Sequence, residues 1–158
     1  MTKYVFNLLE LEVLPHDMEG APAGHEFSRA SLTPRVGAVL TGLGVYELPP
    51  GQSAWPYHFE LGEEEWLIVI TGEVVLRTPT GERTLRPGDV ACFPAGADGA
   101  HAVRNDGDVT ARFAMPSAAP GHLDVAVYPD SGKIKVSGRG FERRFELGAE
   151  REYWEGES

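Results

Sequence analysis

The sequence predicts an all-β protein built from short antiparallel strands. Its 19 glycines and 12 prolines are spread between short apolar runs and are not gathered into one linker, a distribution typical of tight turns between strands. No stretch before residue 140 keeps a helical period over three turns. We therefore expect one small sandwich or barrel, because 158 residues suffice to bury a core as a single domain.

The strands are expected in an even succession along the chain. An edge strand is expected at residues 4–13, followed by a loop at residues 15–24. Further strands are expected at residues 36–40, 44–48, 57–60, 66–70, 73–77, 83–85, 90–93, 101–104 and 110–115, with Gly, Pro or Asp in the turns between them. The continuous apolar run 66–70 predicts a strand buried on both faces. The pair Asp106-Gly107 predicts a hairpin between its flanking strands.

Two extensions flank the expected core, which covers about residues 36–115. The first extension, residues 1–35, holds the edge strand. The second extension, residues 116–158, predicts a hairpin over residues 124–136 around a Pro-Asp-Ser-Gly turn. Its charged end, residues 141–158, predicts a short helix or a frayed tail.

Charge and cysteine content exclude several functions. With 14 Lys and Arg against 24 Asp and Glu, the net charge of -10 disfavours nucleic acids and anionic membranes as partners. The single cysteine, Cys92, excludes an intramolecular disulfide and a multi-cysteine zinc site, and its apolar strand predicts a buried, inert thiol. The N-terminus has no long apolar run and no run spans a bilayer, so we expect a cytoplasmic protein.

Four side chains can converge on one point inside the predicted barrel. His58 and Glu60 stand two residues apart on a strand and so share a face. Glu65 begins the next strand, and His101 shares its face with Val103 and Asn105. Imidazole and carboxylate groups arriving from three strands predict one divalent metal ion held by His58, Glu60, Glu65 and His101. The alternative for Glu60 is a solvated residue in the acidic run with residues 63–65.

These residues lie in a pattern that resembles the cupin superfamily. Its first motif is matched by Gly51, His58, Glu65 and Gly72, and its second by Gly88, Pro94, Gly96, His101 and Asn105. The resemblance covers about half of the chain. It implies a double-stranded β-helix, which is a small jelly-roll barrel, with the N-terminal strand and C-terminal extension added. It is similar to single-domain bacterial cupins of unassigned function, and the family implies a homodimer.

Two departures from the family pattern affect the metal site. Glu60 replaces the second histidine of the family, and the spacer between Gly96 and His101 is longer than in the pattern. The longer spacer can deliver His101 through a bulged loop or move it out of reach. Two carboxylates would harden the ligand set, which favours Fe, Mn, Ni or Zn over copper. Without a metal, crowding them would raise the pKa of one carboxyl.

Two functions remain open from the sequence. The first is a metal-dependent enzyme, of the oxygenase or isomerase type, that acts on a small polar molecule. The second is a metal-free cupin that binds a sugar or small acid without turnover; a structural role comes third. Asn105 is interpreted as structural, His16, His25 and His122 as surface residues, and the aromatic residues Trp55, Tyr57, Trp66 and Phe113 as core packing. No acid or base beyond the four ligands can be named.

Overall fold

The computed structural model describes residues 4–118, 123–138 and 140–157, so the expectation for His122 falls outside the described residues. Nearly all regular structure is antiparallel strand. The elements in chain order are β1 (Leu14–Pro15), β2 (Ser28–Ser31), α1 (Thr33–Val36), β3 (Thr41–Leu48), β4 (Phe59–Glu60), β5 (Glu64–Thr71), β6 (Val74–Thr78), β7 (Gly81–Leu85), β8 (Val90–Phe93), the 3-10 turn η1 (Ala97–Gly99), β9 (Ala102–Arg104), β10 (Ala111–Ala118), β11 (Leu123–Tyr128), β12 (Lys133–Gly138) and β13 (Phe141–Glu146).

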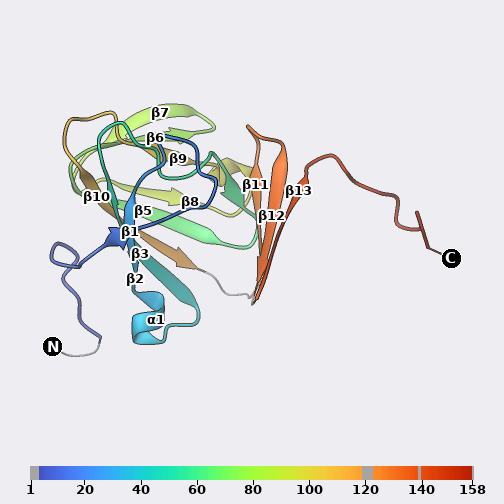
Figure 1. Ribbon diagram of the computed structural model, residues 1–158, viewed down its shortest axis with the longest axis horizontal. Coiled ribbons are helices and arrows are strands. Elements are labelled where there is room, and N and C mark those ends of the chain that lie inside the picture. Colours follow the sequence, from blue (N-terminus) through green and yellow to red (C-terminus); the bar gives the residue numbers. More distant parts are fainter. Residues whose placement is uncertain (1–3, 119–122, 139, 158) are drawn as a thin grey trace.

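The strands form three sheets. A six-stranded sheet has the order β1-β2-β3-β10-β5-β8, a three-stranded sheet the order β7-β6-β9, and a four-stranded sheet the order β13-β12-β11-β4. Figure 1 shows the four-stranded sheet standing at one side of the body formed by the other two, with the C-terminal tail leading away from it. The all-β prediction is confirmed. Over the residues that the structure describes, however, the sheets do not close into a continuously bonded barrel.

The core lies between the six-stranded and the three-stranded sheets, both of which contribute residues to it. Leu67 and Val69, on the inner face of β5, are buried. Trp66, on its outer face, is 40% exposed. The prediction that residues 66–70 are buried on both faces is therefore wrong, because the outer face of this antiparallel sheet contacts solvent. Cys92 pairs with Trp66 across β5 and β8 and is likewise exposed. The expected burial of the Cys92 thiol is wrong for the same reason.

The first forty residues differ from the expected strands. Residues 4–13 form no strand, since the Asn7 side chain accepts a hydrogen bond from the Leu9 amide at 2.9 Å and turns the chain. Residues 33–36 form the single-turn helix α1, which has Pro in its first turn and ends at Gly37 in the left-handed region, with φ 71°. The predicted strand 36–40 is therefore wrong, and the next strand, β3, begins at Thr41.

The Asp106-Gly107 turn connects two sheets. β9 pairs with β6, whereas β10 pairs with β3 and β5. The predicted hairpin is therefore wrong, although both strands exist. The local turn signal gives a reversal of the chain, but the choice of pairing partner depends on the remaining strands.

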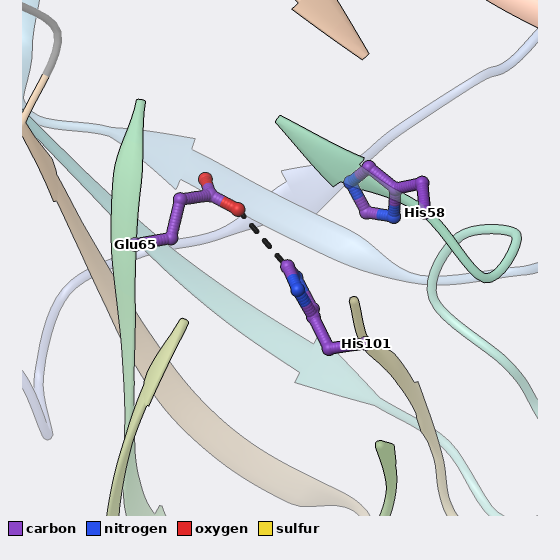
Figure 2. Close-up of side chains that lie close together, drawn as sticks. All are labelled: His58, Glu65 and His101. Atoms are coloured by element: carbon purple, nitrogen blue, oxygen red, sulfur yellow. Dashed lines mark ion pairs between the residues drawn. The ribbon is translucent and has the colours of Figure 1, made fainter. Parts of the chain in front are cut away.

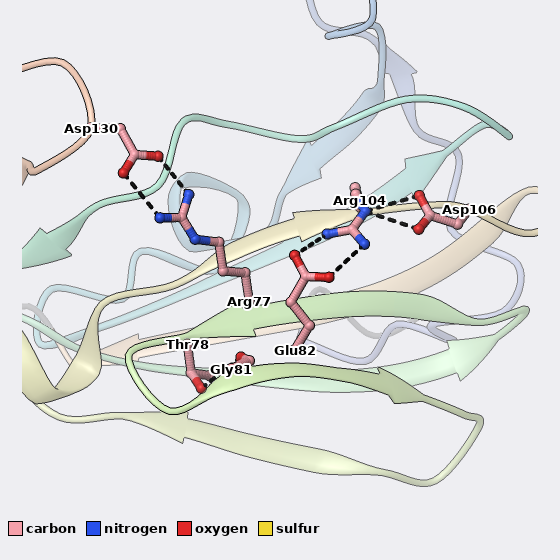
Figure 3. A network of polar contacts seen from close by, with 7 residues as sticks. All are labelled: Arg77, Thr78, Gly81, Glu82, Arg104, Asp106 and Asp130. Carbon is pink, nitrogen blue, oxygen red and sulfur yellow. Dashed lines mark hydrogen bonds and ion pairs between the residues drawn. The ribbon is translucent and has the colours of Figure 1, made fainter.

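The C-terminal extension is attached to the body at two places. The predicted hairpin is confirmed as β11 and β12, but residues 141–146 form a third strand, β13, where a helix or tail was expected. β11 pairs with β4 through Ala126 and Glu60. Arg77 of β6 donates two hydrogen bonds to Asp130 in the turn after β11, at 2.5 and 3.0 Å. Figure 3 shows this pair beside the Arg104 pairs with Glu82 and Asp106, which tie β9 to β7.

Candidate metal centre

His58 and His101 are joined by their backbones. The His58 amide donates to the His101 carbonyl at 3.1 Å, and the His101 amide donates to the His58 carbonyl at 2.8 Å. The longer spacer before His101 forms η1, and His101 is delivered inward with none of its surface exposed. Gly99 permits this path, because a Cβ there would lie 1.9 Å from the Pro94 carbonyl oxygen.

Each of the two imidazoles is oriented by a carbonyl two residues earlier in the chain. The Nδ1 of His58 lies 2.9 Å from the Pro56 oxygen, and the Nδ1 of His101 lies 2.9 Å from the Gly99 oxygen. A carbonyl can only accept, so Nδ1 is the donor in both rings and carries the proton. In its neutral form each ring would therefore present Nε2 as a lone pair, which is the arrangement of metal-ligating histidines whose second nitrogen is held by the protein.

Glu65 completes a group of three possible ligands. It shares the inner face of β5 with Leu67 and Val69, and one ligand atom from each of His58, Glu65 and His101 lies within 4.8 Å of the others. Figure 2 shows Glu65 and His101 pointing toward one another, with His58 entering from another strand; His101 Nε2 lies 3.5 Å from Glu65 Oε2. Among the described residues, buried His101 Nε2 has no hydrogen-bond partner.

Glu60 reaches the centre through His58. Its Oε1 lies 2.9 Å from His58 Nε2, but it does not belong to the group whose atoms are all within 4.8 Å. Sequence parity correctly predicted that His58 and Glu60 share a face. The structure thus brings three of the four predicted residues into one group and places the fourth against one of them.

Burial and neighbouring charge make Glu65 a weak acid in the metal-free protein. Desolvation and the negative charge of Glu60 together raise the pKa of Glu65 to about 7. This is the effect expected from crowding two carboxylates. Burial also lowers the pKa of His101 to about 4, with a contribution from the charge of His58. His101 is therefore neutral at physiological pH, as a metal ligand must be.

The contact between His58 and Glu60 favours the charged form of each group. Burial disfavours a charge on His58, but the hydrogen bond and charge of Glu60, with the charge of Glu65, outweigh it, so the pKa of His58 is raised. Burial likewise opposes ionisation of Glu60, but the hydrogen bond from His58 outweighs it and lowers the pKa of Glu60. The proton that they share must leave before His58 Nε2 can bind an ion.

Aromatic rings hold both imidazoles in place. Phe93, which is the register partner of Glu65 on β8, stacks on His101 with ring centroids 3.8 Å apart and planes 9° apart. Tyr128 of β11 stacks on His58 at 5.5 Å. The C-terminal extension, which sequence reasoning placed outside the barrel core, therefore contributes a side chain to the candidate centre.

The interatomic distances fit a metal ion. Two ligand atoms about 2.1 Å from one ion lie about 3.0 Å apart at a right angle and about 3.4 Å apart in a tetrahedron. The His101–Glu65 separation of 3.5 Å matches the second value, whereas the 2.9 Å His58–Glu60 separation is that of a hydrogen bond. The unpartnered Nε2 of His101 is a further sign, because a buried polar atom without a partner is costly. The residues present thus fit a divalent cation.

The candidate centre opens into a cavity of about 640 Å³ between the six-stranded sheet and the C-terminal sheet. His16 and His25 line this cavity and are half-buried, so their interpretation as surface residues is wrong. Glu63 also lines it, and burial, with the charge of Asp124, raises the pKa of Glu63. The remaining lining includes Arg29, Tyr46, Trp55, Tyr128, Lys133 and Lys135.

Sequence reasoning named none of the cations that line this cavity. Arg29 lies on β2 and Lys133 and Lys135 lie on β12, outside the two motifs. Alternation along a strand shows that such residues share a face, but not which face meets the cavity. Among the aromatic residues, Phe113 is a core residue and Trp55 packs against the core, as expected, whereas Trp66 faces solvent.

Residues 44–117 match the family model of the cupin domain. This range contains both motifs and the three residues of the candidate ligand group, His58, Glu65 and His101. The chain contains a cupin domain. Among proteins of curated function, none matches this cupin significantly.

This cupin is similar to solved structures over most of its length. A candidate sugar phosphate isomerase of Acidithiobacillus ferrooxidans is 25% identical, with a TM-score of 0.81 over 92% of this chain and 91% of the other. A sugar phosphate isomerase from a cupin superfamily, of Silicibacter pomeroyi, is 22% identical, with a TM-score of 0.78 over 96% and 98%. A predicted oxalate decarboxylase of Thermotoga maritima is 23% identical, with a TM-score of 0.60 over 73% and 98%. The last two likenesses show the fold alone.

Proposed function

We propose that this cupin binds one divalent transition metal in its cavity and acts on a small polar molecule there. His58, Glu65 and His101 would hold the ion, and the observation that carries the proposal is their convergence around a buried Nε2 without a partner. An ion held this way leaves coordination positions free and would polarise an oxygen atom of the bound molecule. Its mixed nitrogen and oxygen ligands suit Fe, Mn, Ni or Zn.

Glu60 would be the fourth ligand. Its position 2.9 Å from His58 Nε2 suits two neighbouring ligands of one ion, once His58 has released the proton that the pair shares. Because Glu65 also holds a proton near neutral pH, metal binding would release protons from both carboxylate–histidine pairs. The two carboxylates would then neutralise the charge of the ion.

We place the reaction in the isomerase class rather than the oxygenase class. The support is the similarity, over nearly the whole chain, to the candidate sugar phosphate isomerase of Acidithiobacillus ferrooxidans. A small sugar derivative also suits the polar cavity of about 640 Å³. Fold alone does not determine activity, so the substrate must come from experiment.

The test is elemental analysis of protein purified without chelator or nickel affinity resin. Wild type is compared with His101→Ala and with His16→Ala, a matched control because His16 lines the same cavity outside the ligand group. Support would be near-stoichiometric Fe, Mn, Ni or Zn in wild type and in His16→Ala, and its loss from His101→Ala with the fold retained. Protein that cannot be loaded with any of these ions would contradict the metal centre.

The second candidate is a metal-free cupin that binds a sugar or small acid, and the size of the polar cavity favours it. Such a protein would show thermal stabilisation by ligand with the same metal content in wild type and His101→Ala.

The homodimer and the cytoplasmic location stay predictions. Analytical ultracentrifugation of the full chain tests the first. In the described part of the chain, no helix has the length and apolar character needed to cross a membrane.

A further inference from the structure

We propose that the cavity takes a small anion and that Arg29 binds its carboxylate or phosphate group. This inference deepens the proposed function and rests on it in one respect. Arg29 would bind one end of the ligand, and the metal ion of the proposed function would bind the other. Two observations support this inference: Arg29 lines the cavity, and the other basic side chains of the cavity wall already have neighbours that interact with them.

Arg29 points into the same cavity as the candidate metal centre. It is the register partner of Tyr46 across β2 and β3, and Tyr46 in turn pairs with Phe113 of the core on β10. Partners directly opposite in a sheet present their side chains on one face. The half-buried Arg29 guanidinium lies 5.6 Å from the centre of the Tyr46 ring, and both residues line the cavity.

The three other cations of the cavity wall have neighbours that account for them. Arg144 pairs with Glu142 at 2.6 Å. Lys133 lies over the Tyr128 ring, 4.9 Å from its centre. Lys135 counters an acidic group, since its charge acts to lower the pKa of Glu60, Glu63 and Asp124.

Arg29 lies over the Tyr46 ring, much as Lys133 lies over Tyr128, but it has no acidic partner among the described residues. Among the residues that the structure describes, no carboxylate pairs with its guanidinium, and no hydrogen bond joins it to a neighbour. The chain has 24 acidic residues against 14 basic ones, so an arginine left without one on a cavity wall is informative. A guanidinium offers a planar fork of donors that matches a carboxylate or phosphate with two hydrogen bonds.

Tyr46 lies beside Arg29 on the cavity wall. Burial raises the pKa of its phenol, while Arg29 acts to lower it and Glu65 acts to raise it, so both charges are near the ring. The hydroxyl is therefore protonated at neutral pH and can donate to a bound molecule. Gly44 makes room for the ring, because a Cβ there would lie 2.7 Å from the Tyr46 ring edge.

These features define the ligand class. One end of the ligand is an oxyanion at Arg29, and the other is an oxygen that reaches His58, Glu65 and His101. The hydroxyls of Ser31 and Ser117 line the same cavity, which suits a hydroxylated molecule. A small hydroxylated carboxylate and a small hydroxylated phosphate ester share this chemistry.

The test is isothermal titration of metal-free protein with glycerate, glycerol 3-phosphate and glycerol. Wild type is compared with Arg29→Gln, Arg29→Lys and Arg83→Gln, a control at an exposed arginine of β7. At least one of the two anions should bind more than tenfold tighter than glycerol. Arg29→Gln should weaken that anion by about 10- to 100-fold, Arg29→Lys by less, and Arg83→Gln not at all.

Each outcome decides a separate point. Preference for glycerate or for glycerol 3-phosphate identifies the oxyanion. Anion binding no tighter than glycerol in wild type, or equal in wild type and Arg29→Gln, overturns the proposal. If Arg29→Gln does not fold, Arg29→Lys gives the same comparison, since loss of the fork should still weaken the anion. Metal content is measured in parallel: anion binding through Arg29 without metal loading refutes only the metal centre, and metal loading without anion binding refutes only this inference.

Discussion

His58 and His101 exchange both backbone hydrogen bonds across one antiparallel bridge, and each ring donates from Nδ1 to the carbonyl two residues before it. The backbone thus orients both imidazoles, so that His58 Nε2 faces Glu60 and His101 Nε2 faces Glu65. A substitution outside these four residues is expected to act on the group by moving the bridge or by loosening the rings that pack on it.

Replacing Phe93 should weaken metal binding without removing a ligand. Phe93→Leu loses the ring that stacks on His101 at 3.8 Å, so we expect about a tenfold rise in the metal dissociation constant and about 1–2 kcal/mol lower stability. Metal titration monitored by calorimetry measures the first effect. Phe27→Leu is the matched control, because Phe27 is equally buried but packs on Tyr46 and Trp55. Equal metal affinity in the two variants would contradict this role.

The free energy of unfolding of the metal-free protein should depend on pH through the titration of Glu65. Burial and the charge of Glu60 raise its pKa from 4.5 to about 7. At a pH between these two values, the folded state therefore keeps a proton on Glu65 that the unfolded chain has lost. Stability relative to Glu65→Gln should therefore fall as the pH rises from about 5 to 8, by up to about 3 kcal/mol. Urea unfolding of both proteins with chelator present measures the difference. A difference that does not change with pH would show that Glu65 titrates normally.

Asn105 should prove structural, as its sequence context predicts. It is fully buried, donates to the Leu48 and Val109 carbonyls at 2.7 and 2.8 Å, and accepts from the Gly107 amide at 2.9 Å. Asn105→Ala leaves three backbone groups without partners and should cost about 2–4 kcal/mol of unfolding free energy. Asp108→Ala, at an exposed site of the same turn, should change it by less than about 0.5 kcal/mol. A similar small cost for Asn105→Ala would refute this role.

Arg112 should control the order of the N-terminal segment. Its buried guanidinium donates to the Leu8 and Leu11 carbonyls and pairs with Glu47. We expect Arg112→Met to cost about 2–3 kcal/mol and to expose residues 4–13 to proteases. Limited proteolysis with mass spectrometry locates the cuts, and Arg83→Met serves as an exposed control. Cleavage at equal rates in both variants would contradict the role of Arg112.

The candidate ligands were predictable because they depend on local spacing. His58 and Glu60 share a face by strand parity, and Glu65 and His101 are placed by glycine-rich and proline-rich turns in the two motifs. The separation of Glu60 from the group of three was not predictable, since it depends on how β4 pairs with β11. The wrong expectations at residues 4–13 and 36–40 concern segments that local turns divert from a strand, whereas the one at residues 141–146 concerns a strand that forms by pairing with β12.

The sequence by itself determined the all-β class, the positions of most central strands and the identity of the residues that carry the candidate chemistry. These follow from period-two alternation, turn residues and motif spacing, which are properties of neighbouring residues. Only the tertiary structure decided, over the residues that it describes, that the sheets stay open, that Arg29 lines the cavity without a carboxylate partner, and that Tyr128 packs on His58. Those relationships join residues far apart in the chain, and strand pairing is selected by packing across the whole molecule rather than by local preference.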